Sequence, residues 1–497
     1  MKKYFIPIFF LTLFFATRLI NLNSLPIFTD EAIYIRWGDI ALHDAFHRFI
    51  SLEDGKQPLF IWLMFPFLKL ISDPLIAGRL VSVLAGSFSL AGIYLVAKRL
   101  FSQKTALWAS FLYIICPYFL WYDRLAIYDS LTNAFAIWSL YFTLLFYQKK
   151  DLGTAFLLGF SWGGGLLTKS SAQFFIFLFP ITIILLFIRD CQNSKSATRN
   201  LQLATRYSLI FYSFIALVVA LVMQNIMRLS YLYHMVGLKN LSFIVSWSEF
   251  FAHPFARFWG NFEGTFPWII TYLTIPLALI SAYGLFKLLK QSFWKALILF
   301  SWFIFPYLAL ISFGKVVYPR FFLFMSFPFL ILAAHGLSKF TKGALGVLII
   351  LSIFLYPLYF SSQIIFNVKN APIPRNDRDQ FLDDWPSGYG IPESVEFFKQ
   401  VSQEEPIFVG TEGTFGLTPY ALQLYLPSRD YSEITIRGYW PLNSDVIEEL
   451  SLQAQDQPTY LITKDTQEPD QSWPLKEINL FKKARGDVHL GLYQVLP

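Results

Sequence analysis

Two adjacent carboxylates follow the first hydrophobic segment, and they are the residues best suited to do chemistry. Asp30 and Glu31 come directly after Thr29, in a polar loop that spans about 21–58. An ionisable side chain at a membrane is costly to keep there, so it is a functional candidate by default. Either carboxylate can serve as a general base that takes a proton from a hydroxyl group. The alternative is structural, because Asp30 would also be an ordinary cap for a helix that starts near Ala32.

The composition around this loop indicates a polytopic membrane protein. Hydrophobic residues make up 55% of the chain, charged residues only 15%, and the mean hydropathy is +0.48. A soluble protein carries about a quarter charged residues. The net charge of +7 reflects membrane topology, because no basic patch interleaved with aromatic residues suggests nucleic-acid binding. Two cysteines, Cys116 and Cys191, exclude a disulfide framework or a cysteine-based metal site.

Hydrophobic runs long enough to span a membrane occur about eleven times. They lie near 4–20, 75–97, 105–122, 128–147, 152–168, 170–188, 207–227, 266–286, 294–313, 318–338 and 344–366. The first run resembles a signal peptide, but it lacks a small-residue cleavage site, so we expect an uncleaved span. The run 58–72 is shorter and begins at a proline.

The distribution of basic residues decides whether 58–72 crosses the membrane. If it does not cross and the N-terminus is cytoplasmic, most lysines and arginines of the short loops fall on the cytoplasmic side, as the positive-inside rule requires. The stretch is then a juxtamembrane or re-entrant helix, and the Asp30 loop and the C-terminal tail face outside. The basic residues left in short outer loops are Arg124, Lys169, Lys315 and Arg320. This outer cluster suits an anionic ligand.

The expected fold is mostly α-helical: a polytopic membrane helix bundle with juxtamembrane helices in its first outer loop and a small C-terminal α/β domain. In the C-terminal part, 392–401 is typical of an amphipathic helix, and β-rich runs predict strands near 407–410, 433–437, 459–463 and 488–495. The expected division is a transmembrane module (1–366) with outer loops 21–74 and 228–265, a linker (367–390) and the α/β domain (391–497).

Several short motifs then resemble a known family when taken in order. They are Thr29-Asp30-Glu31-Ala32-Ile33-Tyr34, Lys56-Gln57-Pro58 through Trp62, Gly78-Arg79 through Gly86, Arg124 through Asp129-Ser130, Gly165 through Lys169, and Tyr318-Pro319-Arg320-Phe321. The set resembles the GT-C class of integral-membrane glycosyltransferases, in particular bacterial members of the dolichyl-phosphate-mannose protein mannosyltransferase and aminoarabinose transferase group. The family commonly has Lys-Pro-Pro where this chain has Lys56-Gln57-Pro58.

The resemblance implies an inverting transfer of a sugar from a polyprenyl- or dolichyl-phosphate donor to an acceptor hydroxyl on the outer face. Such a transfer needs a base, for which Asp30 is favoured, with Glu31 positioning the acceptor or a basic side chain. It also needs cations that hold the departing lipid phosphate. The candidates for phosphate binding are Lys56, Arg79, Lys169 and Arg320, and the candidates for supporting roles are Tyr34, Arg124, Asp129 and Glu263.

Each of these assignments has a structural alternative. Lys56 could be an interfacial lysine that lays its stem along apolar surface. Arg79 could form an ion pair, for which Asp73 is the candidate partner, and Arg124 could pair with Asp129 to fix an outer turn.

Metal chemistry is not indicated by the sequence. His43 and His47 are four apart, as two zinc ligands could be, but a surface face explains them equally well. A divalent ion bound by Asp30, Glu31 and Asp129 is conceivable, and nothing in the sequence requires it.

Two further functions compete with the transferase. A transporter or flippase of lipid-linked sugars would show internal repeats and broken helices. The sequence shows neither, and its charges gather at one face. A glycan polymerase or ligase would be a transferase with a polymeric acceptor. The expected location is the plasma (inner) membrane, and the expected partners are the lipid-phosphate sugar, an acceptor of unknown identity and the bilayer, without nucleic acid.

Overall fold

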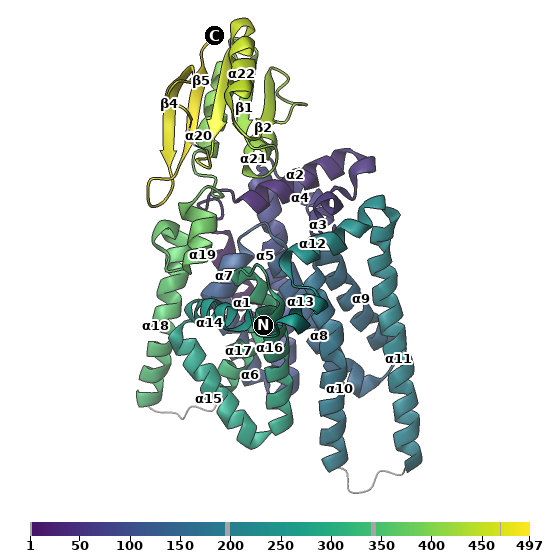
Figure 1. Ribbon diagram of the computed structural model, residues 1–497. Helices are drawn as coiled ribbons and strands as arrows, with labels where there is room; N and C mark the ends of the chain where they lie inside the picture. The colour runs from purple at the N-terminus through teal and green to yellow at the C-terminus, as the bar shows by residue number, and fades with distance from the viewer. Residues whose placement is uncertain (1, 194–198, 339–343, 468) are drawn as a thin grey trace.

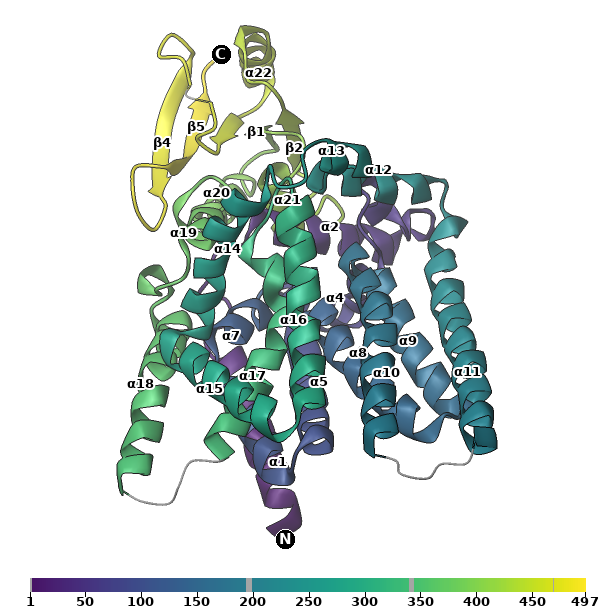
Figure 2. The same cartoon turned by 60° about the horizontal axis from the view of Figure 1, so that its bottom comes forward.

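A bundle of helices carries a small sheet domain at one end (Figure 1). The computed structural model describes residues 2–193, 199–338, 344–467 and 469–497. The turned view shows the loops that join the bundle helices at the end remote from the sheet domain (Figure 2). The predicted fold class, a mostly helical membrane protein with a C-terminal α/β domain, is confirmed.

Each of the predicted hydrophobic runs coincides with a helix or a pair of helices. The bundle helices are α1 (Lys2–Leu19), α5 (Pro74–Leu100), α6 (Gln103–Ile115), α7 (Pro117–Asp123), α8 (Tyr128–Lys149), α9 (Leu152–Thr168), α10 (Gln173–Asn193), α11 (Arg199–Asn225), α14 (Phe258–Leu273), α15 (Ile275–Gln291), α16 (Phe293–Phe313), α17 (Leu323–Ser338) and α18 (Ala344–Phe366).

Fewer helices meet a strict criterion for crossing the membrane. Within the described part of the chain, 6 helices are long and apolar enough, or up to 8 if each bent pair is one span. Shorter apolar helices include Ile6–Leu19, Leu152–Thr168 and Ile353–Phe366. The predicted number of about eleven spans therefore stays a prediction.

Two of the predicted spans are broken, which the sequence did not reveal. α6 and α7 meet at an angle of 60°, and α14 and α15 meet at 96°. Each second helix has a proline in its first turn, and Thr274 between α14 and α15 has a φ of 66°. Proline cannot donate the backbone hydrogen bond that would continue the preceding helix, and a positive φ ends helical geometry. The expectation of unbroken helices is wrong at these two places.

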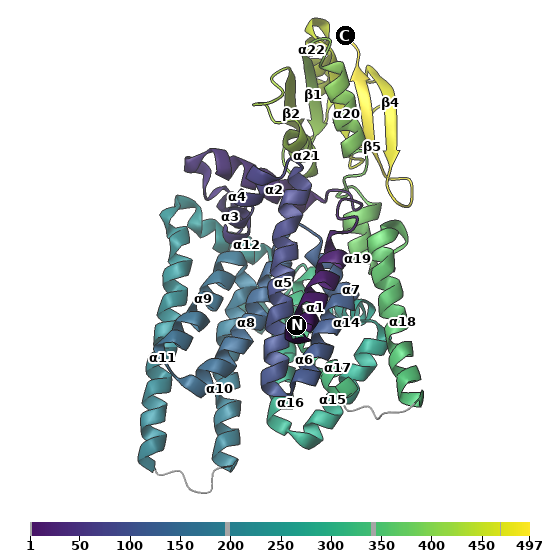
Figure 3. The same cartoon turned by 180° about the vertical axis from the view of Figure 1, so that it is seen from behind.

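The first outer loop folds into short helices that lie between the bundle and the sheet domain (Figure 3). They are α2 (Thr29–His43), η1 (Ala45–His47), η2 (Ile50–Asp54), α3 (Leu59–Leu63) and α4 (Phe65–Leu70). At about 1.5 Å per residue, neither α3 nor α4 can cross a bilayer. The long loop before α14 contains η4 (Ile226–Leu229), η5 (Tyr231–His234), α12 (Met235–Phe243) and α13 (Trp247–Ala252).

The C-terminal domain is a five-stranded mixed sheet with the strand order β2-β1-β3-β5-β4. Its strands are β1 (Ile407–Glu412), β2 (Ile434–Tyr439), β3 (Thr459–Thr463), β4 (Leu475–Lys482) and β5 (His489–Val495), and its helices are α20 (Ile391–Val401), α21 (Leu417–Tyr425) and α22 (Ser444–Asp456). Strands β2, β1 and β3 are parallel, whereas β5 and β4 are antiparallel to their neighbours. The predicted helix and four predicted strands are present; β4, α21 and α22 were not predicted.

The segment between bundle and domain is folded onto both. It contains η7 (Val368–Asn370), α19 (Arg375–Arg378) and a π-helical turn, η8 (Asp379–Asp383). The backbone N–H of Thr29 donates to Pro386 O at 3.0 Å, and Phe28 packs against Phe381 with 4.4 Å between ring centroids. One hydrophobic core runs from the bundle through this segment into the sheet domain. The start of α2 is therefore held from both sides.

Candidate functional site

The two adjacent carboxylates at the start of α2 have different environments. Glu31 is fully buried, whereas the Asp30 side chain is 24% exposed. Phe28 is the N-cap residue of α2, and its N–H donates to Glu31 Oε2 at 3.0 Å. The alternative that Asp30 caps this helix is therefore wrong, because Glu31 accepts the bond from the N-cap backbone.

Glu31 is engaged by a buried arginine through both carboxylate oxygens. Arg79 Nε donates to Glu31 Oε1 at 2.8 Å, and Arg79 Nη2 donates to Oε2 at 2.7 Å. The backbone N–H of Ala126 donates to Oε1 at 2.7 Å. With two donors on each oxygen, Glu31 has little capacity left to take a proton from a substrate. The geometry favours a positioning role over the predicted catalytic role.

Arg79 has no hydrogen-bonding capacity to spare for a ligand. Besides Glu31, its guanidinium donates to the backbone carbonyls of Leu22, Leu25 and Pro26 at 2.7–3.1 Å. It thus fixes the chain that leads into α2, and this geometry does not support the predicted phosphate-binding role. The alternative pairing with Asp73 is also wrong, because Asp73 accepts the N–H of Ile76 and caps α5.

Asp30 faces Arg320 at the mouth of the bundle. Arg320 Nη1 lies 2.9 Å from Asp30 Oδ2, and Tyr34 donates its hydroxyl to the same oxygen at 3.4 Å. Arg320 belongs to η6 (Pro319–Phe322). Its guanidinium carbon lies 5.0–5.8 Å from the ring centroids of Phe28, Tyr318 and Phe321. Although Arg320 Nη1 is ion-paired with Asp30, it makes no hydrogen bond of good geometry to a described residue. Its donors therefore remain available to an oxyanion.

A second ion pair lies next to the first. Lys169, directly after α9, donates to Asp129 at the start of α8 over 2.7 Å, and its ammonium lies 4.6 Å from the Phe321 ring. The Phe321 ring contacts Arg320 as well. Lys169 and Arg320, which lie far apart in sequence, are therefore brought together as predicted.

Lys56 differs from the neighbouring cations because no described carboxylate pairs with it. Its ammonium lies 5.3 Å from the Phe243 ring, while the nearby Asp54 is paired with Lys239. Burial lowers the pKa of Lys56 to about 8, against the opposing attraction of Asp30 and Asp54. A desolvated ammonium without a carboxylate partner leaves this cluster with an excess of positive charge, which suits a phosphate group.

Two further sequence candidates, Arg124 and Glu263, lie outside the cluster of cations. Arg124 donates to the carbonyls of Thr17, Arg18, Ile20 and Asn21 at 2.6–3.1 Å, which secures the end of α1. It does not pair with Asp129. Glu263 is exposed on α14 and makes no hydrogen bond or ion pair with the described residues of the cluster.

The histidine pair is not arranged as a metal site. His43 Nδ1 lies 2.8 Å from the Asp39 carbonyl, and His47 Nδ1 lies 2.7 Å from Asp44 Oδ2. Across the described ranges, no group of three or more His, Cys, Asp or Glu side chains is placed to hold a metal ion.

One carboxylate near the cluster was missed by sequence reasoning. Asp377, from α19 in the predicted linker, is buried and accepts the hydroxyls of Tyr122 and Tyr272. Burial raises the pKa of Asp377 to about 6, and the charges of Arg320 and Asp129 act on it less strongly. Nothing in the Pro- and Asp-rich sequence around it distinguishes this aspartate from its neighbours. Tyr272 lies beside the break between α14 and α15, whereas Tyr122 lies near the end of α7.

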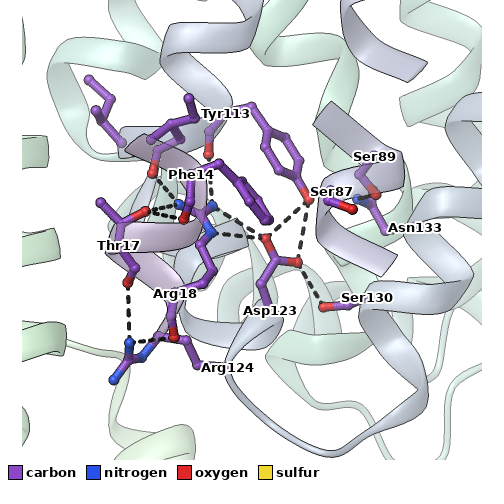
Figure 4. Close-up of polar contacts among 12 residues, drawn as sticks. Phe14, Thr17, Arg18, Ser87, Ser89, Tyr113, Asp123, Arg124, Ser130 and Asn133 are labelled. Atoms are coloured by element: carbon purple, nitrogen blue, oxygen red, sulfur yellow. Dashed lines mark hydrogen bonds and ion pairs between the residues drawn. The ribbon is translucent and has the colours of Figure 1, made fainter. Parts of the chain in front are cut away.

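A buried polar cluster inside the bundle has no hydrogen-bonding capacity left for a ligand (Figure 4). Arg18 and Asp123 are both fully buried and lie 3.3 Å apart. Asp123 also accepts the hydroxyls of Tyr113 and Ser130, and Arg18 donates to the carbonyls of Tyr113 and Ile114. The cluster ties α1 to α6 and α7.

The arrangement of bundle, first-loop helices and C-terminal sheet domain is a GT-C fold, the fold that the solved structures below share. A sequence model of the family described as dolichyl-phosphate-mannose-protein mannosyltransferase matches residues 55–223. No curated protein matches the sequence significantly.

Solved structures of this class match nearly the whole chain. ArnT from Cupriavidus metallidurans in the apo state is 12% identical, with a TM-score of 0.62 over 99% of this chain and 97% of that one. The same enzyme bound to undecaprenyl phosphate is 15% identical, with a TM-score of 0.59 and the same coverage. The archaeal oligosaccharyltransferase AglB from Archaeoglobus fulgidus, in complex with an inhibitory peptide and a dolichol-phosphate, is 14% identical, with a TM-score of 0.52 over 93% and 69% of the two chains. The resemblance drawn from the sequence motifs is confirmed.

Proposed function

We propose that the chain is an inverting glycosyltransferase that moves a sugar from a polyprenyl-phosphate donor to an acceptor hydroxyl. The observation that carries this proposal is the cluster around Asp30. It combines a partly exposed carboxylate with its ion-pair partner Arg320, whose Nη1 makes no well-aligned hydrogen bond, and with Lys56, which lacks a carboxylate partner among the described residues. Two of the similar structures hold undecaprenyl phosphate or dolichol-phosphate, which supports a lipid phosphate as the donor's leaving group.

The proposed reaction is a single displacement. Asp30 takes the proton of the acceptor hydroxyl, and the oxygen attacks the anomeric carbon. The bond between that carbon and the phosphate oxygen breaks, and the phosphate leaves with the electron pair. Lys56, Arg320 and Lys169 stabilise the charge that develops on the phosphate, because donors fixed in advance cost no reorganisation during the reaction.

The direct test is incubation of the purified protein with a panel of polyprenyl-phosphate sugars and an extract of cell-envelope acceptors. Release of polyprenyl phosphate, coupled to labelling of an acceptor, is the expected result for at least one donor. The broken spans α6–α7 and α14–α15 are the feature that favours a transporter instead. A transporter would neither break the donor in detergent nor label an acceptor, so the same assay separates the two functions.

The outer-face location of the site is part of this proposal and has its own test. Cys191 is an exposed free cysteine near the end of α10, at the end of the bundle remote from the sheet domain (Figure 1). A membrane-impermeant maleimide added to intact cells should leave Cys191 unlabelled. It should label a cysteine placed by Asp430→Cys in a Cys191→Ser background. Labelling of Cys191 alone would reverse the orientation.

A further inference from the structure

A basic pocket lies at the end of the bundle remote from the sheet domain, far from Asp30. Its volume is about 440 Å³, and it is formed where α5 and α17 end, α6 and α16 begin, and α15 turns into α16. Lys104, Lys295 and His335 line it, together with the hydroxyl-bearing residues Ser102, Thr105, Ser292 and Ser338. None of the described lining residues is acidic.

Both lysines reach the pocket with donors to spare. Lys104 Nζ donates to the carbonyl of Ser338 at 3.0 Å, and Lys295 Nζ donates to the carbonyl of Leu100 at 2.5 Å. An ammonium group has three N–H donors, so each lysine can offer further ones to a ligand. The bonds to these carbonyls hold the two ammonium groups at the pocket and also complement the ends of α17 and α5.

Two helix starts add to the positive character of the pocket. Ser102 is the N-cap of α6, and its hydroxyl accepts the N–H of Thr105. Ser292 is the N-cap of α16, and its side chain makes no capping hydrogen bond. Helix N-termini carry partial positive charge and unpaired N–H groups, which reinforce the two lysines.

We propose that this pocket binds a phosphate group, supplied by the headgroup of an anionic phospholipid in the membrane leaflet on this side. Two lysines, hydroxyl donors and two helix starts around one cavity match a phosphodiester, and basic pockets between transmembrane helices hold anionic headgroups in this way. The pocket lies where headgroups are found, since the ends of membrane-spanning helices line it. This binding site is independent of the proposed transfer reaction.

The test is binding of a fluorescent phosphatidylglycerol to the purified, delipidated full chain, with phosphatidylcholine as the zwitterionic comparison. The wild-type protein should bind phosphatidylglycerol in preference. The double variant Lys104→Gln/Lys295→Gln should weaken that binding about tenfold or more. The matched control is Lys290→Gln, which removes an exposed lysine of α15 outside the pocket and should change binding less than twofold. Equal effects of the control and the double variant would overturn the proposal.

A second variant keeps the test valid if the double variant does not fold. Ser292→Asp preserves a good N-cap residue for α16 and places a carboxylate at the pocket, so it should lower phosphatidylglycerol affinity about tenfold without lowering the unfolding temperature. Unchanged affinity in this variant would contradict the proposal.

Competition with inorganic phosphate distinguishes the two sources of the phosphate. If millimolar phosphate displaces the lipid only weakly, the headgroup is the ligand. If it displaces the lipid completely, with the same dependence on Lys104 and Lys295, the site takes a free anion and the assignment to a phospholipid is overturned.

Discussion

Two ion pairs made by neighbouring carboxylates differ in how completely they are buried. We call the buried pair closed and the partly exposed pair open. Glu31 and Arg79 are fully buried, and Arg79 directs every branch of its guanidinium to Glu31 or to backbone carbonyls. Asp30 and Arg320 are partly exposed, and Arg320 retains unused donors. The Arg18–Asp123 cluster resembles the closed pair (Figure 4). Adjacent carboxylates in one helix turn thus have different environments, one holding the loop and the other left partly exposed, as the proposed base would have to be.

The largest effect is expected for Asp30→Asn, which removes the proposed base from the open pair. Loss of a general base costs a rate factor of about 10²–10⁴. The amide remains similar in size, so the protein should accumulate in the membrane as the wild type does. Transfer is measured as release of polyprenyl phosphate under saturating donor. A rate within threefold of wild type would remove Asp30 from the chemistry.

Breaking the closed pair should affect folding before it affects catalysis. Arg79→Met leaves the Glu31 carboxylate buried without its partner, and such a change costs about 3–5 kcal/mol of stability. We expect a clearly lower unfolding temperature in detergent and less protein in the membrane. Arg320→Met, the matched change in the open pair, should lower donor turnover with a much smaller loss of stability. If the two variants lost stability equally, the distinction between the pairs would fail.

The pH dependence of donor binding sharpens the assignment of Lys56. Because burial lowers the pKa of its ammonium to about 8, the positive charge is present below that pH and is lost as the pH rises through it. Affinity for polyprenyl phosphate should therefore fall above pH 8, by about tenfold for the loss of one charged hydrogen bond. Bound phosphate stabilises the ammonium, so the midpoint in the complex lies higher. The comparison is Lys56→Met, whose affinity should be low and nearly flat from pH 7 to 9. A wild-type profile equally flat would exclude Lys56 as a phosphate ligand.

The smallest effect is expected for Asp377→Asn. The amide oxygen can still accept the hydroxyls of Tyr122 and Tyr272, and only a charge near Arg320 is lost. We expect turnover to change less than fivefold. Replacement by alanine, which removes the acceptor as well, should cost more, because the buried tyrosine hydroxyls lose their partner. A hundredfold loss in Asp377→Asn would mean that the charge itself takes part in catalysis.

The sequence revealed those features that depend on composition along a short stretch. Hydrophobic runs mark helices because lipid and core both select apolar side chains, and the short runs of β-branched, aromatic and aliphatic residues in 407–410 and 459–463 mark buried strands for a similar reason. The gathering of Asp30, Lys169 and Arg320 was predicted because charge counting assigned their loops to one face.

What the sequence did not reveal depends on pairing across long separations. Arg79 pairs with Glu31 and not with Asp73, because Asp73 caps α5 at the point where that helix begins. Asp377 meets Tyr122 and Tyr272 across sequence separations of 255 and 105 residues. Neither is encoded in a local pattern.

The bonds between Thr29 and Pro386 have a mechanical consequence. Both the backbone N–H and the hydroxyl of Thr29 donate to the Pro386 carbonyl at 3.0 Å, one residue before Asp30. On the far side of Pro386 the chain enters the sheet domain, and the Phe415 ring lies 6.1 Å from the Trp37 ring on α2. A displacement of the sheet domain is thereby transmitted to the backbone that carries Asp30. Any molecule that binds the domain more tightly in one position than in another would shift the population of active-site geometries by that difference in affinity.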